Sequence, residues 1–410
     1  MNILYINHYA GSKNHGMAFR PYYLAKEWLK SGHQVTIIAA SHSHLRNLQP
    51  DVTESITEET IDGIQYSWIK TSKYGSNGIR RFINIGQFIF GLFRNAKCYV
   101  ESKDPDVVIA SSTYPMDIWP AKFIAKRAGA RLVFELHDVW PQSLIEAGGL
   151  HRFHPFVLLN GWAETVVYRS ADRIVSMLPA IHNHCSSKGY DLAKVSVVSN
   201  GADMSEWNAS DRSFIPQAIK DAIDSAHSQK LRIVCYTGAH GVPNDLDNLL
   251  NAAKLLANEH IIFLLIGNGH HKVELAKKAQ REGLENVRMF DSVPKSSIPS
   301  ILEACDIAFI GAKKQPLYQH GISPNKIMDY MMSSTPIISA IAAGNDPVKD
   351  AGCGITVTPE DSIALADGVK SLCLLSGKEL SAMGAAGKVY ALKNYSYEVL
   401  ATRFMQVLQD

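Results

Sequence analysis

The stretch that decides the fold is residues 2–40, which read NILYINHYAGSKNHGMAFRPYYLAKEWLKSGHQVTIIAA. An apolar strand at 2–7 is followed by a polar, glycine-bearing loop at 8–16. Residues 18–30 place apolar side chains at helical spacing, and a β-branched strand follows at 34–40. Strand, loop, helix and strand in this order form a βαβ unit, the building block of parallel sheets.

The loop at 8–16 differs from the glycine-rich loop that binds dinucleotides. Its two glycines, Gly11 and Gly16, do not have the GxGxxG spacing of that fingerprint. NAD is therefore not the expected ligand.

The same alternation continues to residue 200 and starts afresh after a polar, Ser- and Asp-rich passage that reaches about residue 230. A hairpin is expected around 61–66. Further strands are expected at 106–111, 131–136, 171–177 and 195–198, and then at 231–236, 261–266, 287–290, 307–310 and 337–339. The pattern predicts an α/β protein of two Rossmann-like domains facing a central cleft, 1–200 and 201–390. We expect a C-terminal helix in 391–410 to return to the first domain.

Composition excludes several classes of function. The chain has 410 residues, 46% hydrophobic and 20% charged, so it can bury large cores. Its formal net charge of +2 gives no reason to expect nucleic acid as a partner. Residues 1–200 hold 21 Lys and Arg against 16 Asp and Glu, so the first half is mildly basic.

The cysteines and the lengths of the apolar segments indicate the cellular compartment of the protein. Six cysteines are scattered without close pairs, which suits free thiols in a reducing compartment. The first residues lack the pattern of a signal peptide, and no run reaches the roughly 18–20 apolar residues that span a bilayer. We expect a cytoplasmic protein.

Residues 80–94 form a helical pattern dense in Phe and Ile, with Arg at both ends. That composition suits a helix lying in a membrane interface, on the inner face of the cytoplasmic membrane. It also suits a core helix whose arginines reach out to water, which is the commoner case. Both interpretations stay open at this point.

His137 and Asp138 follow the strand predicted at 131–136. In open α/β sheets, ligands bind beyond the carboxyl ends of the strands. The pair is therefore a candidate for catalysis, although a lone histidine is often structural.

A second candidate site lies where a loop turns into a helix at 320–331. Ser323 is expected to be the N-cap and Pro324 the first helical residue. The amides of Asn325 and Lys326 would then form an anion site, with the lysine adding a cation. Asp329, one turn deeper, is placed to accept hydrogen bonds from sugar hydroxyls. The pattern indicates a nucleotide-sugar diphosphate site, or else a capped core helix with a polar first turn.

Six segments, in this order across the chain, carry a resemblance to a known family. They are Asn7 to Arg20 with 32–36, Glu135 to Pro141, Ser199 to Asp203, Thr237 to Gly241, Gly267 to Gly269, and Ser323 to Met331. The chain resembles the retaining GT-B glycosyltransferases of family four. It is similar to a bacterial surface-polysaccharide subgroup that includes N-acetylfucosamine-type transferases.

The resemblance implies transfer of a sugar, an N-acetylated hexosamine or deoxyhexosamine, from a UDP-sugar donor, without cofactor or metal. It implies a glycan or polyprenyl-diphosphate-linked acceptor in O-antigen or capsule synthesis. The catalytic residues implied are His137 and Asp138. The donor-binding residues implied are Gly16, Gly238, His240, Gly269, Lys272, Val293, Ser323, Pro324, Asn325, Lys326 and Asp329.

This chain departs from the family pattern at several donor contacts. Two glutamates eight residues apart are expected, and here they correspond to Gly321 and Asp329. An Arg and Lys of the first loop of the second domain are replaced by Ala239 and Asn244. The charge opposite the phosphates would then come from Lys326 and the helix end, with Lys272.

Two other functions fit the same resemblance. One is a UDP-sugar epimerase, which would need no acceptor. The other is a non-catalytic nucleotide-sugar-binding partner, which the missing donor contacts would favour. The DxD spacings at 104–106 and 245–247 have the form of metal motifs, but we interpret them as caps.

Overall fold

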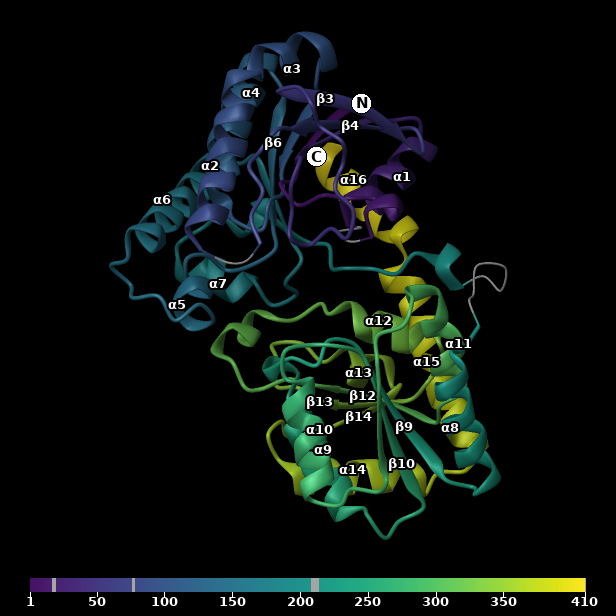
Figure 1. Cartoon of the computed structure of the whole chain (residues 1–410). Helices are drawn as coiled ribbons and strands as arrows, with labels where there is room; N and C mark the ends of the chain where they lie inside the picture. The colour runs from purple at the N-terminus through teal and green to yellow at the C-terminus, as the bar shows by residue number, and fades with distance from the viewer. Residues whose placement is uncertain (17–19, 76–77, 208–213, 410) are drawn as a thin grey trace. The chain divides into compact units, whose positions relative to one another are not determined.

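The computed structural model describes residues 1–16, 20–75, 78–207 and 214–409. The chain divides into two compact units (Figure 1). Unit 1 is Met1–Asn200 with Tyr397–Asp410, and unit 2 is Gly201–Ser396. The return to unit 1 thus begins at Tyr397, compared with the predicted residue 391.

Unit 1 contains an eight-stranded sheet in the order β3-β4-β2-β1-β5-β6-β7-β8. All neighbours are parallel except β3 and β4, which form the expected hairpin. The central strand β1 lies between β2 and β5, so the strand order reverses there. The strands are β1 Asn2–Ile6, β2 Gln34–Ala40, β3 Ile56–Ile61, β4 Ile64–Ile69, β5 Val107–Ala110, β6 Arg131–Leu136, β7 Arg173–Ser176 and β8 Val195–Val197.

Helices cover both faces of this sheet. On one face, α1 and α16 share a core with the strands, and the Trp28 indole donates to the Ala401 carbonyl at 3.0 Å. On the other, α2, α4 and α6 lie side by side (Figure 1). The helices are α1 Arg20–Lys30, α2 Ile79–Arg94, α3 Ala96–Lys103, α4 Ile118–Ala128, α5 Gln142–Glu146, α6 Pro155–Ser170, α7 His182–Ser187 and α16 Tyr397–Gln409.

Unit 2 contains a six-stranded parallel sheet in the order β11-β10-β9-β12-β13-β14, the order of the doubly wound dinucleotide-binding fold. Its reversal lies between β9 and β12, next to the loop that follows β9. The strands are β9 Arg232–Thr237, β10 Ile261–Ile266, β11 Val287–Phe290, β12 Ile307–Gly311, β13 Ile337–Ala340 and β14 Gly354–Thr356.

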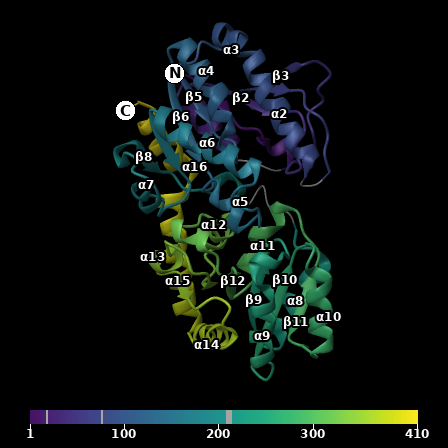
Figure 2. The ribbon, with the colours of Figure 1, turned by 90° about the vertical axis from the view of Figure 1, so that its left-hand side faces the viewer.

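Two buried clusters hold helices on the faces of the second sheet. One takes residues from α8, α11, α12, α13 and α15, and the other from α9, α10 and α14. In both views α12 lies beside α15 (Figures 1 and 2). The helices are α8 Gln217–Ser228, α9 Leu246–Leu255, α10 Lys272–Arg281, α11 Ile298–Glu303, α12 Asn325–Met332, α13 Pro347–Ala351, α14 Ser362–Cys373 and α15 Gly377–Tyr395.

The predicted α/β architecture of two Rossmann-like domains is confirmed, and one local expectation was wrong. The polar passage before residue 230 contains α8, because Ile219, Ile223 and Ala226 recur at helical spacing and are buried. All six cysteines are free thiols. Across the described ranges, no helix is long and apolar enough to cross a bilayer.

Candidate functional site

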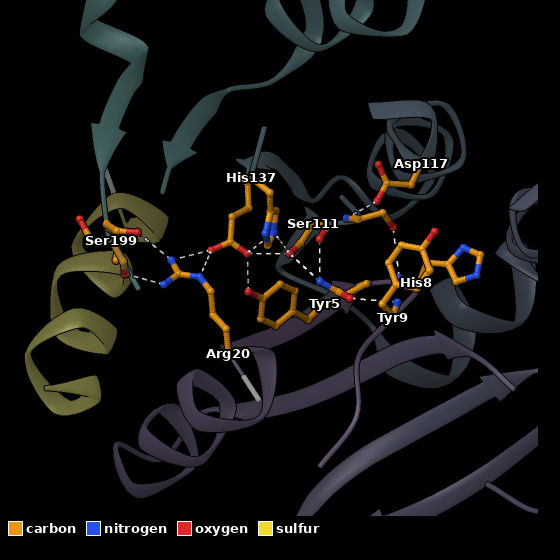
Figure 3. A network of polar contacts seen from close by, with 12 residues as sticks. Tyr5, His8, Tyr9, Arg20, Ser111, Asp117, His137 and Ser199 are labelled. Carbon is orange, nitrogen blue, oxygen red and sulfur yellow. Dashed lines mark hydrogen bonds and ion pairs between the residues drawn. The ribbon is translucent and has the colours of Figure 1, made fainter. Parts of the chain in front are cut away.

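A buried ion pair organises the carboxyl-terminal edge of the first sheet (Figure 3). Arg20, at the start of α1, lies with its Nε 2.9 Å from Glu135 Oε1 and donates to the carbonyls of Val198 and Ser199. Burial would raise the pKa of Glu135, but Arg20 and the other donors around it hold that pKa well below its ordinary value. Glu135 is therefore a fixed negative charge.

Glu135 in turn orients His137. The hydroxyls of Tyr5 and Ser111 each donate to Glu135 Oε2 at 2.6 Å. The His137 Nε2 atom lies 3.1 Å from Ser111 Oγ and 3.5 Å from Glu135 Oε2 (Figure 3). The ring thus turns Nε2 inward, and Nδ1 has no hydrogen-bond partner among the described residues. This leaves Nδ1 to face a reactant.

The two predicted catalytic residues interact through their charges: desolvation raises the pKa of Asp138, and the nearby His137 opposes that rise. Asp138 is exposed, and no hydrogen bond or ion pair links it to His137 within the described ranges. The carboxylate beside His137 is that of Glu135, which sequence reasoning missed. The signal was present, since Glu135 is an acidic residue in an otherwise apolar strand.

The loop after β1 is closed by its own hydrogen bonds. The His8 ring bonds the Tyr114 hydroxyl through Nδ1 and the Asn84 Oδ1 atom through Nε2 at 2.7 Å. Burial lowers the pKa of His8 to about 3, so the ring is neutral at pH 7. In the next loop the backbone N–H of Ser112 donates to Asp117 at 2.8 Å, and burial raises the pKa of Asp117 to about 7. Asp117 lies close enough to His137 for their charges to interact.

Gly16 ends this loop in a left-handed conformation with φ of 78°. A Cβ at this position would lie 2.6 Å from the Asn47 amide nitrogen, so packing also requires glycine. The expected approach of Gly16 to a diphosphate stays a prediction.

In unit 2, Lys326 lies across the loop that follows β9. Its Nζ donates to the Tyr236 hydroxyl and to Asn244 Oδ1, both at 2.8 Å. A Cβ on Gly238 would lie 2.3 Å from Lys326 Cε, so glycine makes this crossing feasible. Burial lowers the pKa of Lys326 to about 8. Asn244 therefore anchors this half-buried lysine at the loop that follows β9.

His240 in the same loop is fully buried, and neither ring nitrogen has a partner among the described residues. Burial, with Lys272 and Lys326 nearby, lowers the pKa of His240 to about 4, so the ring is neutral. Gly269 allows the close contact of the two loops, because a Cβ there would lie 2.3 Å from the His240 carbonyl oxygen. Buried polar atoms without partners are costly, so water or a ligand is expected to complete their bonding.

The start of α12 differs from the predicted cap. Helix α12 begins at Asn325, and Pro324 is the N-cap, with extended φ of −76° and ψ of 133°. Ser323 therefore lies one position too early to cap the helix. Because α12 starts later than expected, the amides of Asn325 and Lys326 are its first two, and neither has a partner among the described residues. Anion binding by these two amides stays a prediction.

Asp329 lies one turn along α12 and is half-buried. Burial raises its pKa to about 6, against an opposing effect of Lys295. Its carboxylate has no hydrogen-bond partner within the described ranges, so it can still accept from sugar hydroxyls.

Lys272 forms an ion pair with an acidic residue. Its Nζ lies 2.7 Å from Asp291 Oδ1 and 3.0 Å from Asn268 Oδ1. Val293 is half-buried and packs against the core of unit 2. Gly238, His240, Gly269 and Lys326 thus come together, whereas Lys272 pairs with an acidic residue.

The DxD spacings do not converge into a cluster. Asp247 bonds His271 at 2.7 Å, while Asp245 is the buried N-cap residue of α9. Asp104 ends α3 as its C-cap. Within the described residues, no group of three or more His, Cys, Asp or Glu side chains is arranged to hold a metal ion.

Comparison with known proteins gives matches for both units. Residues 15–201 match the family described as "Glycosyl transferase 4-like domain", and residues 231–374 match "Glycosyl transferases group 1". The probable glycosyltransferase WbjE of Pseudomonas aeruginosa is 24% identical over 78% of this chain and 78% of its own length.

A second relative is WcaI of Escherichia coli (strain K12), whose name assigns it provisionally to colanic acid biosynthesis as a glycosyl transferase. It is 23% identical over 85% of this chain and 86% of its own length. Among solved structures, HepE of Anabaena in complex with UDP and glucose aligns over 100% of both chains with a TM-score of 0.68 and 15% identity.

Proposed function

We propose that this chain, which carries both domains of a glycosyltransferase, transfers a sugar from a UDP-linked donor to a glycan acceptor with retention at the anomeric carbon. Unit 2 would hold the donor, and unit 1 would supply the acceptor side. The structure of HepE, a complex with UDP and glucose, supports a nucleotide-sugar donor.

One observation carries the proposal: a half-buried lysine, a neutral histidine and two helix amides lie in unit 2, and the histidine ring and the amides have no partners among the described residues. In sugar transfer from UDP, negative charge grows on the departing diphosphate. Donors held in place before the reaction stabilise that charge, and removing one typically costs about 2.7–4 kcal/mol. Lys326 and the start of α12 would supply this charge without a metal ion.

His137 would act from unit 1. Its inward Nε2 is fixed by Ser111 and Glu135, so its Nδ1 is presented in one orientation. Nδ1 would contact the donor sugar or the acceptor hydroxyl. Asp329 would accept hydrogen bonds from the ribose, and Val293 lies in the loop expected to contact the uracil.

For the acceptor we propose a lipid-linked glycan in surface-polysaccharide synthesis, with an N-acetylated hexosamine or deoxyhexosamine as the donor sugar. The name of WcaI, which includes colanic acid biosynthesis, is consistent with this class of product. Helix α2 exposes Ile79, Phe82 and Phe90 beside arginines. Such a helix suits contact with the cytoplasmic membrane.

A screen of UDP-sugars for UDP release, with and without glycan acceptors, tests the proposal. We expect release that depends on an acceptor, and mass spectrometry should show one added sugar. Conversion of a UDP-sugar to its epimer without acceptor would establish the isomerase instead. UDP binding without turnover of any donor would establish a non-catalytic binding protein.

Contact with the membrane is tested separately by flotation. We expect the protein to float with vesicles that contain phosphatidylglycerol and not with pure phosphatidylcholine. A Phe90→Ser variant should float less, and Val273→Ser, on an exposed position of unit 2, serves as the matched control. Absence of the wild type from the anionic vesicle fraction would overturn the assignment of α2 to the membrane.

A further inference from the structure

Unit 1 contains a cavity of about 690 Å³ whose lining is mainly apolar. This volume is within the usual range for small-molecule pockets, roughly 300–1,000 Å³. The cavity lies between α2, the loop after β5 and the segment 140–159. Its apolar walls include Phe82, Ile85, Trp140, Leu144, Leu150 and Phe156.

The outer end of the cavity lies at the exposed face of α2. Ile79 and Phe82 both line the cavity, and yet they are 76% and 45% exposed. Phe82 also packs edge-on against Phe156 of α6, with 5.4 Å between ring centroids. The mouth of the cavity is therefore continuous with the apolar surface that α2 presents to its surroundings.

The inner end of the cavity reaches the polar network beside His137. Tyr114 lines the cavity and bonds the His8 ring with its hydroxyl. Trp140, three residues after His137, forms another wall, and its buried indole nitrogen has no partner among the described residues. The cavity thus joins the outer face of α2 to the loops that carry the candidate catalytic histidine.

The charge around the cavity favours an anionic ligand. Residues 70–100 contain six Lys and Arg and no Asp or Glu. Arg81 lines the cavity, where its guanidinium lies 3.0 Å from the Tyr9 hydroxyl and packs over the Tyr9 ring. An arginine held in this way is suited to a phosphate. Apolar walls with a cationic residue fit an amphiphile with a phosphate head.

We infer that this cavity binds the hydrocarbon chain of a phosphate-bearing lipid acceptor, with Arg81 and the Trp140 indole donating to the phosphate. The inference rests on the proposed function and names the part of the acceptor that unit 1 takes. A glycan would not occupy the apolar end, because its hydroxyls would lose their hydrogen bonds to water without replacement.

A chain-length series tests the inference directly. Hexyl, octyl and decyl phosphate are titrated into the whole protein, and binding is followed by calorimetry. We expect affinity to rise by about fourfold for each methylene that enters the cavity. Octanol should bind more weakly than octyl phosphate, because it lacks the charge that meets Arg81. Affinity that does not depend on chain length would overturn the inference.

A cavity-filling variant locates the binding. Leu144→Trp fills the cavity from α5, a helix without buried residues, so the fold should tolerate it. We expect it to abolish the gain with chain length. Phe90→Trp, on α2 outside the cavity, should keep that gain. An equal loss in both variants would mean that the alkyl chain binds the outer surface of α2.

Calorimetry with UDP separates this inference from the proposed function. UDP binding belongs to unit 2, so Leu144→Trp should bind UDP as the wild type does, which also shows that it has folded. If UDP-dependent transfer to a water-soluble glycan occurs but alkyl phosphates do not bind, the cavity assignment alone fails. If neither UDP nor any donor is bound or turned over, the proposed function fails as well.

Discussion

The loops after β1 and β9 occupy the same place in their sheets. We call the loop after β1 closed because its buried histidine is hydrogen-bonded, and the loop after β9 open because its buried histidine has no partner among the described residues. Each contains a fully buried histidine whose pKa is lowered by burial, to about 3 for His8 and about 4 for His240. His8 bonds Tyr114 and Asn84, whereas His240 has no partner among the described residues. The topology therefore sets where each loop lies. Its side chains decide whether its polar groups are hydrogen-bonded within the protein or remain able to bind a ligand.

This difference suggests that the loops of the two units serve different functions. In unit 1, Ser111 and Glu135 hold the Nε2 side of His137, so the network orients the candidate catalytic side chain. In unit 2, Lys326 lies near His240, whose ring nitrogens have no partner among the described residues, so a bound ligand would complete the bonding of this loop. The four predictions below test the closed network and the open loop in turn.

The largest effect is expected for His137→Ala. Loss of a general acid or base typically costs about 10²–10⁴-fold in rate. The variant should lower kcat to this extent while its Kd for UDP, measured by calorimetry, stays near that of the wild type. His151→Ala, an exposed histidine of unit 1, is the control and should keep full activity. A kcat near the wild-type value in His137→Ala would falsify the catalytic role.

The second prediction breaks the ion pair of the closed network. Arg20→Met leaves Glu135 buried and unpaired, so we expect unfolding free energy to fall by about 3–5 kcal/mol. Urea denaturation measures this. Lys30→Met, which cuts an exposed pair with Glu27, should change stability by about 0–1 kcal/mol. Equal losses of unfolding free energy in the two variants would show that the buried ion pair stabilises the protein no more than the exposed pair does.

The third prediction concerns the charge of the open loop. Lys326→Met removes a charge-assisted donor worth about 1.5–3 kcal/mol, so UDP affinity should fall by about 10–100-fold. Burial lowers the pKa of Lys326 to about 8, and only the protonated form attracts a phosphate. Wild-type affinity should therefore decline as pH rises through about 8, and the variant should lose this decline.

Lys277→Met, on an exposed position of α10, is the control and should behave as the wild type does. If Lys326→Met keeps both the affinity and the pH dependence, the diphosphate binds elsewhere in unit 2.

The smallest effect compares the two histidines directly. His8→Leu removes a hydrogen-bond partner of Tyr114 and of Asn84, so it should lower the free energy of unfolding by about 1–3 kcal/mol. His240→Leu removes two buried nitrogens that have no partner among the described residues, so it should be neutral or stabilising in urea denaturation. Adding UDP should then raise the stability of the wild type more than that of His240→Leu. A similar destabilisation in both variants would remove the distinction between the loops.

Much of the fold was determined by the sequence itself. Strands β2 and β6 begin and end at the predicted residues, because apolar periodicity and neighbouring glycines and prolines act locally. Helix α8 was missed where polar residues surround three buried positions. The position of His137 after a strand was also predictable, since it follows from the strand alone.

Only the tertiary structure decided which groups meet. Arg20 and Glu135 are separated by 115 positions, and Lys326 and Tyr236 by 90, so no local pattern could pair them. The later start of α12, the pairing of Lys272 with Asp291 and the isolation of His240 are equally matters of packing. The sequence determined the local elements because their bonds join near neighbours. Burial, charge and partners depended on chain segments that only folding brings together.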